Sequence, residues 1–199
     1  MVSSRLKEWF QGKAAHISKP LAQIGVTPNT LTLAGLLAAA ASATAFSQGE
    51  GYTALAGLLA LLSGLLDALD GVLARVSGKA TRWGGFLDSV ADRASDGLLY
   101  SGVLVGGLCD PVVCLVALLA SQLVSYSRAR AEAEGVRMAG VGLAERGERI
   151  LLLGASGIAA HWWPPTLCLA VAATGLLSVF TVLQRTWFFK KNVGEVNAS

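Results

Sequence analysis

The chain has 199 residues, of which 53% are apolar and only 15% are charged, and its formal net charge is +3. Soluble domains carry about 25% charged residues, so this composition excludes an ordinary soluble domain. Apolar runs of about 20 residues, the length that crosses a bilayer, recur along the chain and predict an all-α polytopic membrane protein. The three cysteines lie in apolar segments without metal-ligand spacing, so we interpret Cys109, Cys114 and Cys168 as small buried hydrophobic side chains.

The first 20 residues precede the apolar runs and combine apolar and basic side chains at helical spacing. We expect an N-terminal amphipathic helix over residues 1–20 that lies on an anionic membrane surface, with a short soluble helix as the alternative. No apolar run begins before about residue 28, so we expect no cleavable signal peptide. The side chains that define the two faces are Leu6, Trp9, Phe10 and Ile17, and Arg5, Lys7, Lys13 and Lys19.

Six apolar segments follow, and we expect each to form a transmembrane helix. Thr27 is a favourable N-cap for the first, and Pro28 suits its first helical position. We expect one domain over residues 1–199, with a six-helix bundle over residues 28–189. The expected spans cover residues 28–46, 52–76, 83–108, 112–133, 143–160 and 166–189.

Basic residues lie on alternate connections between these spans. The N-terminal segment, the connector after the second span, the region around spans four and five and the C-terminal end hold all but one of the 16 Lys and Arg residues. The turns near residues 47–51, 109–111 and 161–165 contain none. Because cytoplasmic connections carry the excess of positive charge, we predict a multi-pass protein of the cell membrane with both termini in the cytoplasm.

Four aspartates lie at the predicted cytoplasmic ends of the second and third spans. Asp67 and Asp70 are three residues apart, and Asp88 and Asp92 are four apart, so each pair lies on one helical face. Carboxylates in apolar helices are costly unless a partner compensates them, and the two nearby arginines cannot neutralise four acids. Carboxylate oxygens favour hard cations such as Mg²⁺, Mn²⁺ or Ca²⁺, so the stretch predicts a metal site.

Glycines and cations beside the acids favour a phosphate-bearing substrate. Gly71 and Gly84 would let a backbone or ligand come close to the acids. Carboxylates, metal ions and phosphate-binding cations at one face of the membrane indicate phosphoryl chemistry on a lipid-soluble substrate. The connector residues that could bind phosphate are Arg75, Lys79, Thr81 and Arg82.

The spacing of this stretch resembles the signature of the CDP-alcohol phosphotransferase family. The resemblance extends over essentially the whole chain, because the family has six transmembrane helices, an N-terminal amphipathic helix and a Thr-Pro-Asn-like start to its first span. It implies a transferase that takes a CDP-linked lipid and an alcohol and releases CMP. The positions that match the signature are Asp67, Asp70, Gly71, Ala74, Arg75, Gly84, Asp88 and Asp92.

The resemblance also implies the roles of individual residues. Two Mg²⁺ ions, with Mn²⁺ as an alternative, would be held by Asp67, Asp70, Asp88 and Asp92, and Asp92 would also be the catalytic general base. The family resemblance implies a homodimer, and Gly102-x3-Gly106 could permit close helix packing. The residues expected to contact CDP-diacylglycerol or CDP-archaeol are Asn29, Thr32, Gly71, Arg75 and Thr81.

The second substrate should be selected by basic residues of the last three spans. Guanidinium groups bind phosphate bidentately, so we expect an acceptor that carries a phosphate; positive-inside topology is the alternative explanation for these cations. Ser-Tyr-Ser-Arg-Ala-Arg-Ala-Glu, followed by Glu-Arg-Gly-Glu-Arg, is similar to the phosphatidylinositol-phosphate and archaetidylinositol-phosphate synthase branches, which use inositol 1-phosphate. The residues expected to bind the acceptor phosphate are Ser125, Arg128, Arg130, Arg146, Arg149 and Arg185.

Other functions are less consistent with the sequence. A glycerol 3-phosphate acceptor, as in a phosphatidylglycerol-phosphate synthase, would also require arginines. A cation transporter would need acidic residues across the membrane, whereas these gather at one face. An inactive member should have lost part of the signature, and none is lost. Membrane lipids are the expected surroundings, and no nucleic-acid partner is expected. Asp96 continues the acidic stripe outside the signature, and we interpret it as a supporting or helix-packing residue.

Overall fold

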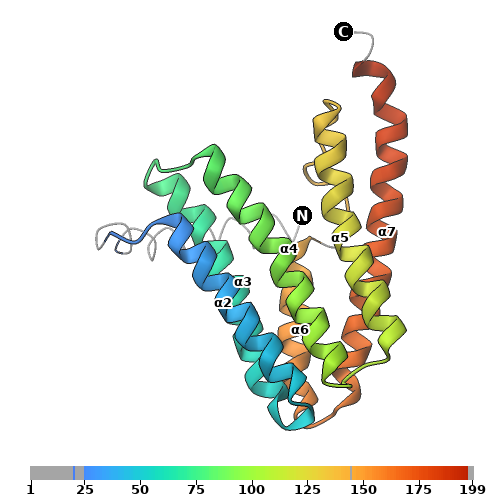
Figure 1. Cartoon of the computed structure of the whole chain (residues 1–199). Helices are drawn as coiled ribbons and strands as arrows, with labels where there is room; N and C mark the ends of the chain where they lie inside the picture. The colour runs from blue at the N-terminus through green and yellow to red at the C-terminus, as the bar shows by residue number, and fades with distance from the viewer. Residues whose placement is uncertain (1–19, 21–24, 144, 197–199) are drawn as a thin grey trace.

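The computed structural model describes residue 20, residues 25–143 and residues 145–196, with side chains up to residue 193. The described part is all-helical, as predicted (Figure 1). The predicted amphipathic helix lies almost entirely outside the described residues. The elements are α2 (Pro28–Ser47), the 3-10 turn η1 (Glu50–Tyr52), α3 (Thr53–Val76), α4 (Arg82–Val105), α5 (Pro111–Ala133), α6 (Arg146–Ala160) and α7 (Pro165–Val196).

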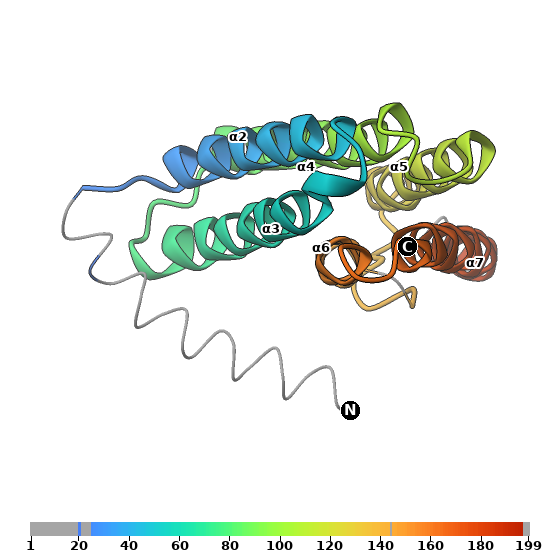
Figure 2. The ribbon, with the colours of Figure 1, turned by 90° about the horizontal axis from the view of Figure 1, so that it is seen from below.

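The six helices of the described part pack as a closed ring, with α2, α4 and α5 along one side and α3, α6 and α7 along the other (Figure 2). Each packs on two main neighbours, in the order α2, α3, α6, α7, α5, α4 and back to α2. Consecutive helices run in opposite directions, so the end of α3 and the starts of α4 and α6 lie toward the same end of the bundle (Figure 1). This order places the two acidic helices, α3 and α4, next to the two that begin or end with arginines, α6 and α5.

Side-chain caps fix where several helices begin. Thr27 accepts a hydrogen bond from the backbone N of Thr30 at 3.3 Å, and Pro28 occupies the first turn of α2. Thr81 caps α4 by accepting from the N of Gly84 at 2.9 Å. Both predicted cap residues of α2 are therefore confirmed, and the starts of α2 and α4 are fixed close to the acidic stretch.

Glycines allow the closest helix contacts in the ring. A Cβ added to Gly57 in α3 would overlap the backbone oxygen of Gly154 in α6. A Cβ at Gly102 or Gly106 in α4 would overlap backbone atoms of α2. The close packing predicted for the Gly102-x3-Gly106 pair thus occurs within this chain, between α4 and α2, and gives no support to a contact between chains.

Among the described residues, four helical segments are long and apolar enough to cross a membrane: α2, η1 with α3, α5 and α7. The chain is therefore a membrane protein by the length and composition of its helices. The other two helices depart from that profile for different reasons. Charged residues, including Asp88, Asp92 and Asp96, interrupt α4, and α6 has only 15 residues, about 22 Å. Six helices are confirmed, while six complete spans stay a prediction.

The interpretation of the cysteines was wrong for two of the three. Cys109, in the turn between α4 and α5, forms a disulfide with Cys168 in α7. Only Cys114 is a free buried thiol, as expected. The disulfide joins the ends of helices remote from the acidic stretch.

Candidate active site

Three aspartates converge between α3 and α4. Asp67, Asp70 and Asp88 each offer a carboxylate oxygen, and these oxygens all lie within 4.8 Å of one another. Asp70 is buried, and the other two are half-buried. Three oxygen ligands at one point suit a hard divalent cation, so these residues fit the metal site that the sequence predicts.

Asp92 lies one turn further along α4 and has basic partners. Its Oδ1 lies 2.8 Å from Nη1 of Arg146, and its Oδ2 lies 3.5 Å from Nη1 of Arg93. The four predicted metal ligands are thus divided in this structure. Three face one another, and the fourth, Asp92, contacts arginines and lies beside Asp67.

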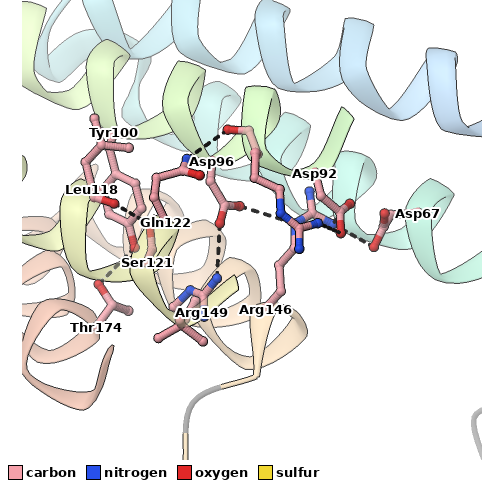
Figure 3. A network of polar contacts seen from close by, with 12 residues as sticks. Asp67, Asp92, Asp96, Tyr100, Leu118, Ser121, Gln122, Arg146, Arg149 and Thr174 are labelled. Atoms are coloured by element: carbon pink, nitrogen blue, oxygen red, sulfur yellow. Dashed lines mark hydrogen bonds and ion pairs between the residues drawn. The ribbon is translucent and has the colours of Figure 1, made fainter. Parts of the chain in front are cut away.

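Arg146 bridges the two acidic helices (Figure 3). Its Nη1 lies 2.7 Å from Oδ2 of Asp67 on α3 and 2.8 Å from Oδ1 of Asp92 on α4. Its Nε lies 3.2 Å from Oδ1 of Asp96, whose Oδ2 accepts a hydrogen bond from Arg149 at 3.1 Å. Sequence reasoning assigned both arginines to a phosphate and missed these ion pairs, because it considered only arginines close in sequence to the acids.

The start of α6 aims both arginines at the acids. The side chain of Glu148 accepts a hydrogen bond from the backbone N of Glu145 at 3.1 Å, which is half of a capping box. Arg146 and Arg149 are three residues apart on the following turn, so they point from one face of α6. Asp96, only 7% exposed at its side chain, lies between them, in agreement with the supporting role expected for it.

Two of the five aspartates around this site form no ion pair within the described part of the chain. Among the described residues, Asp67, Asp92 and Asp96 form ion pairs with Arg93, Arg146 and Arg149. Asp70 and Asp88 have no such partner there, and their surroundings are partly buried, where an uncompensated carboxylate is costly. One divalent cation would supply the missing charge.

Several residues expected to bind the CDP-lipid lie beside the acids. Thr32 of α2 donates a hydrogen bond to Oδ2 of Asp70 at 2.6 Å. A Cβ on Gly84 would lie 3.2 Å from Oδ1 of Asn29, so the first turns of α2 and α4 are adjacent. The structure therefore brings Asn29, Thr32 and Thr81, the cap of α4, to the end of the bundle that holds the acids.

Gly71 and Arg75 occupy one face at the end of α3. A Cβ on Gly71 would lie 3.5 Å from Nη1 of Arg75, so the guanidinium group lies over the glycine. Arg75 is exposed. This leaves its charge accessible to a phosphate beside the carboxylates.

The remaining basic residues form a less compact group. Arg185 is buried on α7, and its Nε donates to the carbonyl of Val141 at 2.9 Å while Nη1 donates to the carbonyl of Val124. Arg128 and Arg149 are near enough to repel it. Arg128 is exposed and pairs with Glu132 at 2.9 Å. Half-buried Ser125 lies one turn before Arg128 on the same helix.

Arg130 is more exposed than the predicted acceptor-binding residues Arg128, Arg146 and Arg149. Its side chain is 63% exposed and forms an ion pair with Glu134 on the same helix. Successive helical positions two apart do not share a face, so Arg128 and Arg130 point in different directions. The predicted set of six is thus brought together only in part.

Comparisons with known proteins identify the family of this chain. Residues 25–189 match the model of the family described as CDP-alcohol phosphatidyltransferase. An archaetidylinositol phosphate synthase of Pyrococcus horikoshii is 38% identical over 191 residues, which is 96% of this chain and 97% of the relative. Two solved structures of Mycobacterium tuberculosis phosphatidylinositol phosphate synthase, both 32% identical, are similar in fold. The one in complex with manganese and citrate has a TM-score of 0.77 and covers 89% of this chain and 88% of that one. The other, with CDP-DAG bound, has a TM-score of 0.76 and covers 88% and 92%.

Proposed function

Since the chain belongs to the CDP-alcohol phosphatidyltransferase family, we propose that it transfers the lipid phosphate group of a CDP-linked lipid to a hydroxyl of inositol 1-phosphate and releases CMP. The observation that carries the proposal is the convergence of Asp67, Asp70 and Asp88 on one point, beside an arginine-rich set on α5 to α7. The lipid group would be phosphatidyl or archaetidyl, because both kinds of synthase are similar to this chain over most of its length.

The acidic residues would hold the metal ions. Asp67, Asp70 and Asp88 are the ligands supported by their geometry, and Asp92 would join them once Arg146 releases it. Mg²⁺ is the proposed ion, with Mn²⁺ as a substitute, because carboxylates suit both. Divalent cations bound here would neutralise the diphosphate and polarise it toward attack. Thr32, by its hydrogen bond to Asp70, would keep that carboxylate turned toward the site.

Asp92 would act as the general base. A bond forms between the acceptor hydroxyl oxygen and the β-phosphorus of the CDP-linked lipid, the phosphoanhydride bond breaks, and CMP leaves with the bridging oxygen. The hydroxyl proton passes to a carboxylate oxygen of Asp92. This residue is suited to the role because its carboxylate lies at the edge of the three-aspartate group, and release of Arg146 would leave Oδ1 to face the acceptor.

The CDP moiety would bind at the starts of α2 and α4. Asn29, Thr32, Gly71, Arg75 and Thr81 are the proposed contacts. The lack of a side chain at Gly71 leaves room beside the guanidinium of Arg75, which would pair with a phosphate.

The acceptor phosphate would bind among the arginines. We propose that Arg128, Arg149 and Arg185 line this site, since they lie near one another and none of them pairs with Asp67, Asp70 or Asp88 among the described residues. Ser125 and Arg146 are proposed to complete this site. Arg130 is also proposed to contribute, but less directly, because it is exposed at the surface of α5. Glycerol 3-phosphate is the second candidate acceptor, because it would present the same phosphate to the same side chains.

Orientation and assembly complete the proposal. Both termini and the acidic site would face the cytoplasm, which the distribution of basic residues and the disulfide at the other end support. Residues 1–199 would form one domain. A homodimer rests on the family resemblance alone, because the glycine pair of α4 packs against α2.

The deciding experiment is a CMP-release assay with the purified full-length protein in detergent and Mg²⁺. CDP-diacylglycerol and CDP-archaeol are offered in separate reactions, each with inositol 1-phosphate, glycerol 3-phosphate or unphosphorylated inositol. We expect turnover with inositol 1-phosphate and none with inositol. Turnover with glycerol 3-phosphate alone would assign the other branch of the family, and no CMP with any acceptor would contradict the proposal.

A further inference from the structure

Arg146 places its charge where a cation between the two acidic helices would lie. Its Nη1 is 2.7 Å from an oxygen of Asp67 and 2.8 Å from an oxygen of Asp92. This nitrogen is buried, yet it has no hydrogen-bond partner among the described residues, since neither contact has the required geometry. The guanidinium group makes a directed hydrogen bond to Asp96 through Nε, at 3.2 Å, whereas its Nη1 only places positive charge between Asp67 and Asp92, as a metal ion would.

Building on the proposed function, we propose that Arg146 is an exchangeable internal cation. In the metal-free protein it occupies Asp67 and Asp92, and a divalent cation displaces it from these carboxylates. The released guanidinium group then binds the phosphate of the acceptor. Arg146 would be a positioning residue that makes the acceptor site complete only after the metal site is filled.

The neighbours of Arg146 permit this exchange without refolding. Its backbone belongs to the capped first turn of α6, so only the side chain needs to move. Asp96 also accepts a hydrogen bond from Arg149 at 3.1 Å, so its carboxylate keeps a basic partner if Arg146 moves away. Arg149 in turn lies near Arg185, so the α6 arginines stand between the acidic cluster and the basic group.

Charge favours displacement of Arg146 by a divalent ion. With Arg146 on Asp67 and Asp92, the carboxylates of Asp70 and Asp88 have no ion pair among the described residues and remain as ligands for such an ion. With an ion bound there, the guanidinium group would lose two of its three carboxylate partners, keep Asp96, and become available to an anion. Binding free energies are reciprocal, so metal and acceptor should each tighten the binding of the other by the same factor.

The test measures Mn²⁺ binding to the purified full-length protein by electron paramagnetic resonance of the free ion, without CDP-lipid. Arg146→Gln removes the internal cation, and we expect it to bind Mn²⁺ about tenfold more tightly, the scale of one charge-assisted contact. Arg146→Lys keeps the charge and should stay within about threefold of the unsubstituted protein. The exposed Arg137→Gln is the matched control for loss of one positive charge.

A second measurement repeats the titration with inositol 1-phosphate present. The unsubstituted protein should bind Mn²⁺ more tightly with this probe, and Arg146→Gln should lose that effect. Unchanged or weaker Mn²⁺ binding by a folded Arg146→Gln protein would overturn the inference. If that variant does not fold, the titration of the unsubstituted protein still tests the inference. Mn²⁺ affinity that does not change when inositol 1-phosphate is added would also overturn the inference.

Asp88→Asn separates this inference from the proposed metal site. Asp88 is a proposed ligand with no ion pair to Arg146. If Asp88→Asn weakens Mn²⁺ binding while Arg146→Gln leaves it unchanged, the metal site stands and the exchange is wrong. If Asp88→Asn binds Mn²⁺ as the unsubstituted protein does, the metal site itself is wrong and the exchange fails with it.

Discussion

The acidic and the basic parts of the site are organised in different ways. On α3 and α4, Asp67, Asp70 and Asp88 already face one another, with ligand oxygens within 4.8 Å. On α5 to α7, the arginines are each occupied: Arg128 by a glutamate, Arg146 by aspartates and Arg185 by backbone carbonyls. The acidic part thus has to release one arginine, Arg146, to bind a cation, whereas each of these three arginines must exchange its partners before it binds a phosphate. We expect changes to the acidic part to stop the reaction and changes to the basic part to adjust substrate affinity.

Metal removal should have the largest effect. Treatment with EDTA leaves uncompensated carboxylates in the acidic cluster and no cation for the diphosphate, so CMP release should fall to background. Adding Mg²⁺ or Mn²⁺ in excess of the chelator should restore it. Full activity in EDTA-treated, metal-free protein would show that the acidic part does not act through a metal ion.

Asp92→Asn should reduce the rate of CMP release by about 10²–10⁴-fold, the range of a general base. Asparagine keeps the size of the side chain and loses the ability to accept the proton. The measurement is kcat at saturating substrates, together with equilibrium binding of CDP-diacylglycerol, which should be retained. Asp110→Asn, in the turn before α5 and far from the acidic cluster, is the control. Turnover by Asp92→Asn within threefold of normal would exclude its role as base.

Arg185→Lys should act on affinity rather than rate. Arginine donates to the carbonyls of Val141 and Val124 at once, and lysine cannot reproduce that fork. We expect the KM for inositol 1-phosphate to rise about tenfold, with kcat and the KM for CDP-diacylglycerol nearly unchanged. A fall in kcat with normal KM would mean that Arg185 belongs functionally with the acids.

The sequence predicted the acidic part better than the basic part for a physical reason. Spacings of three and four residues determine which aspartates share a helix face, so the α3 and α4 clusters follow from local geometry. The contact between Arg146 and Asp92 joins α6 to α4, and the disulfide joins residues 59 positions apart. Such contacts depend on how the ring of helices closes. Helical periodicity does not specify this closure.

Arg185 is a second residue whose partners could not be predicted from the sequence. Its charge in an apolar helix correctly indicated that it needs a partner. The partners are backbone carbonyls of Val124 and Val141, and every residue has a carbonyl, so no side-chain pattern marks them. The sequence therefore indicated that Arg185 needs partners, but it could not indicate which groups those partners are.

The smallest effect should come from releasing an arginine instead of removing one. Arg128 pairs with Glu132 at 2.9 Å, and both side chains are partly exposed, so the pair contributes at most about 1 kcal/mol. Glu132→Gln should free Arg128 for the acceptor phosphate and lower the KM for inositol 1-phosphate by about two- to fivefold. Glu134→Gln, which releases the more exposed Arg130 in the same way, is the matched control and should change the KM little.

Equal effects of both changes would show that the two arginines act only through the general positive charge of this end of the bundle. A rise in KM for Glu132→Gln would show that Arg128 needs its glutamate to be positioned, and then the basic part would be as preorganised as the acidic one.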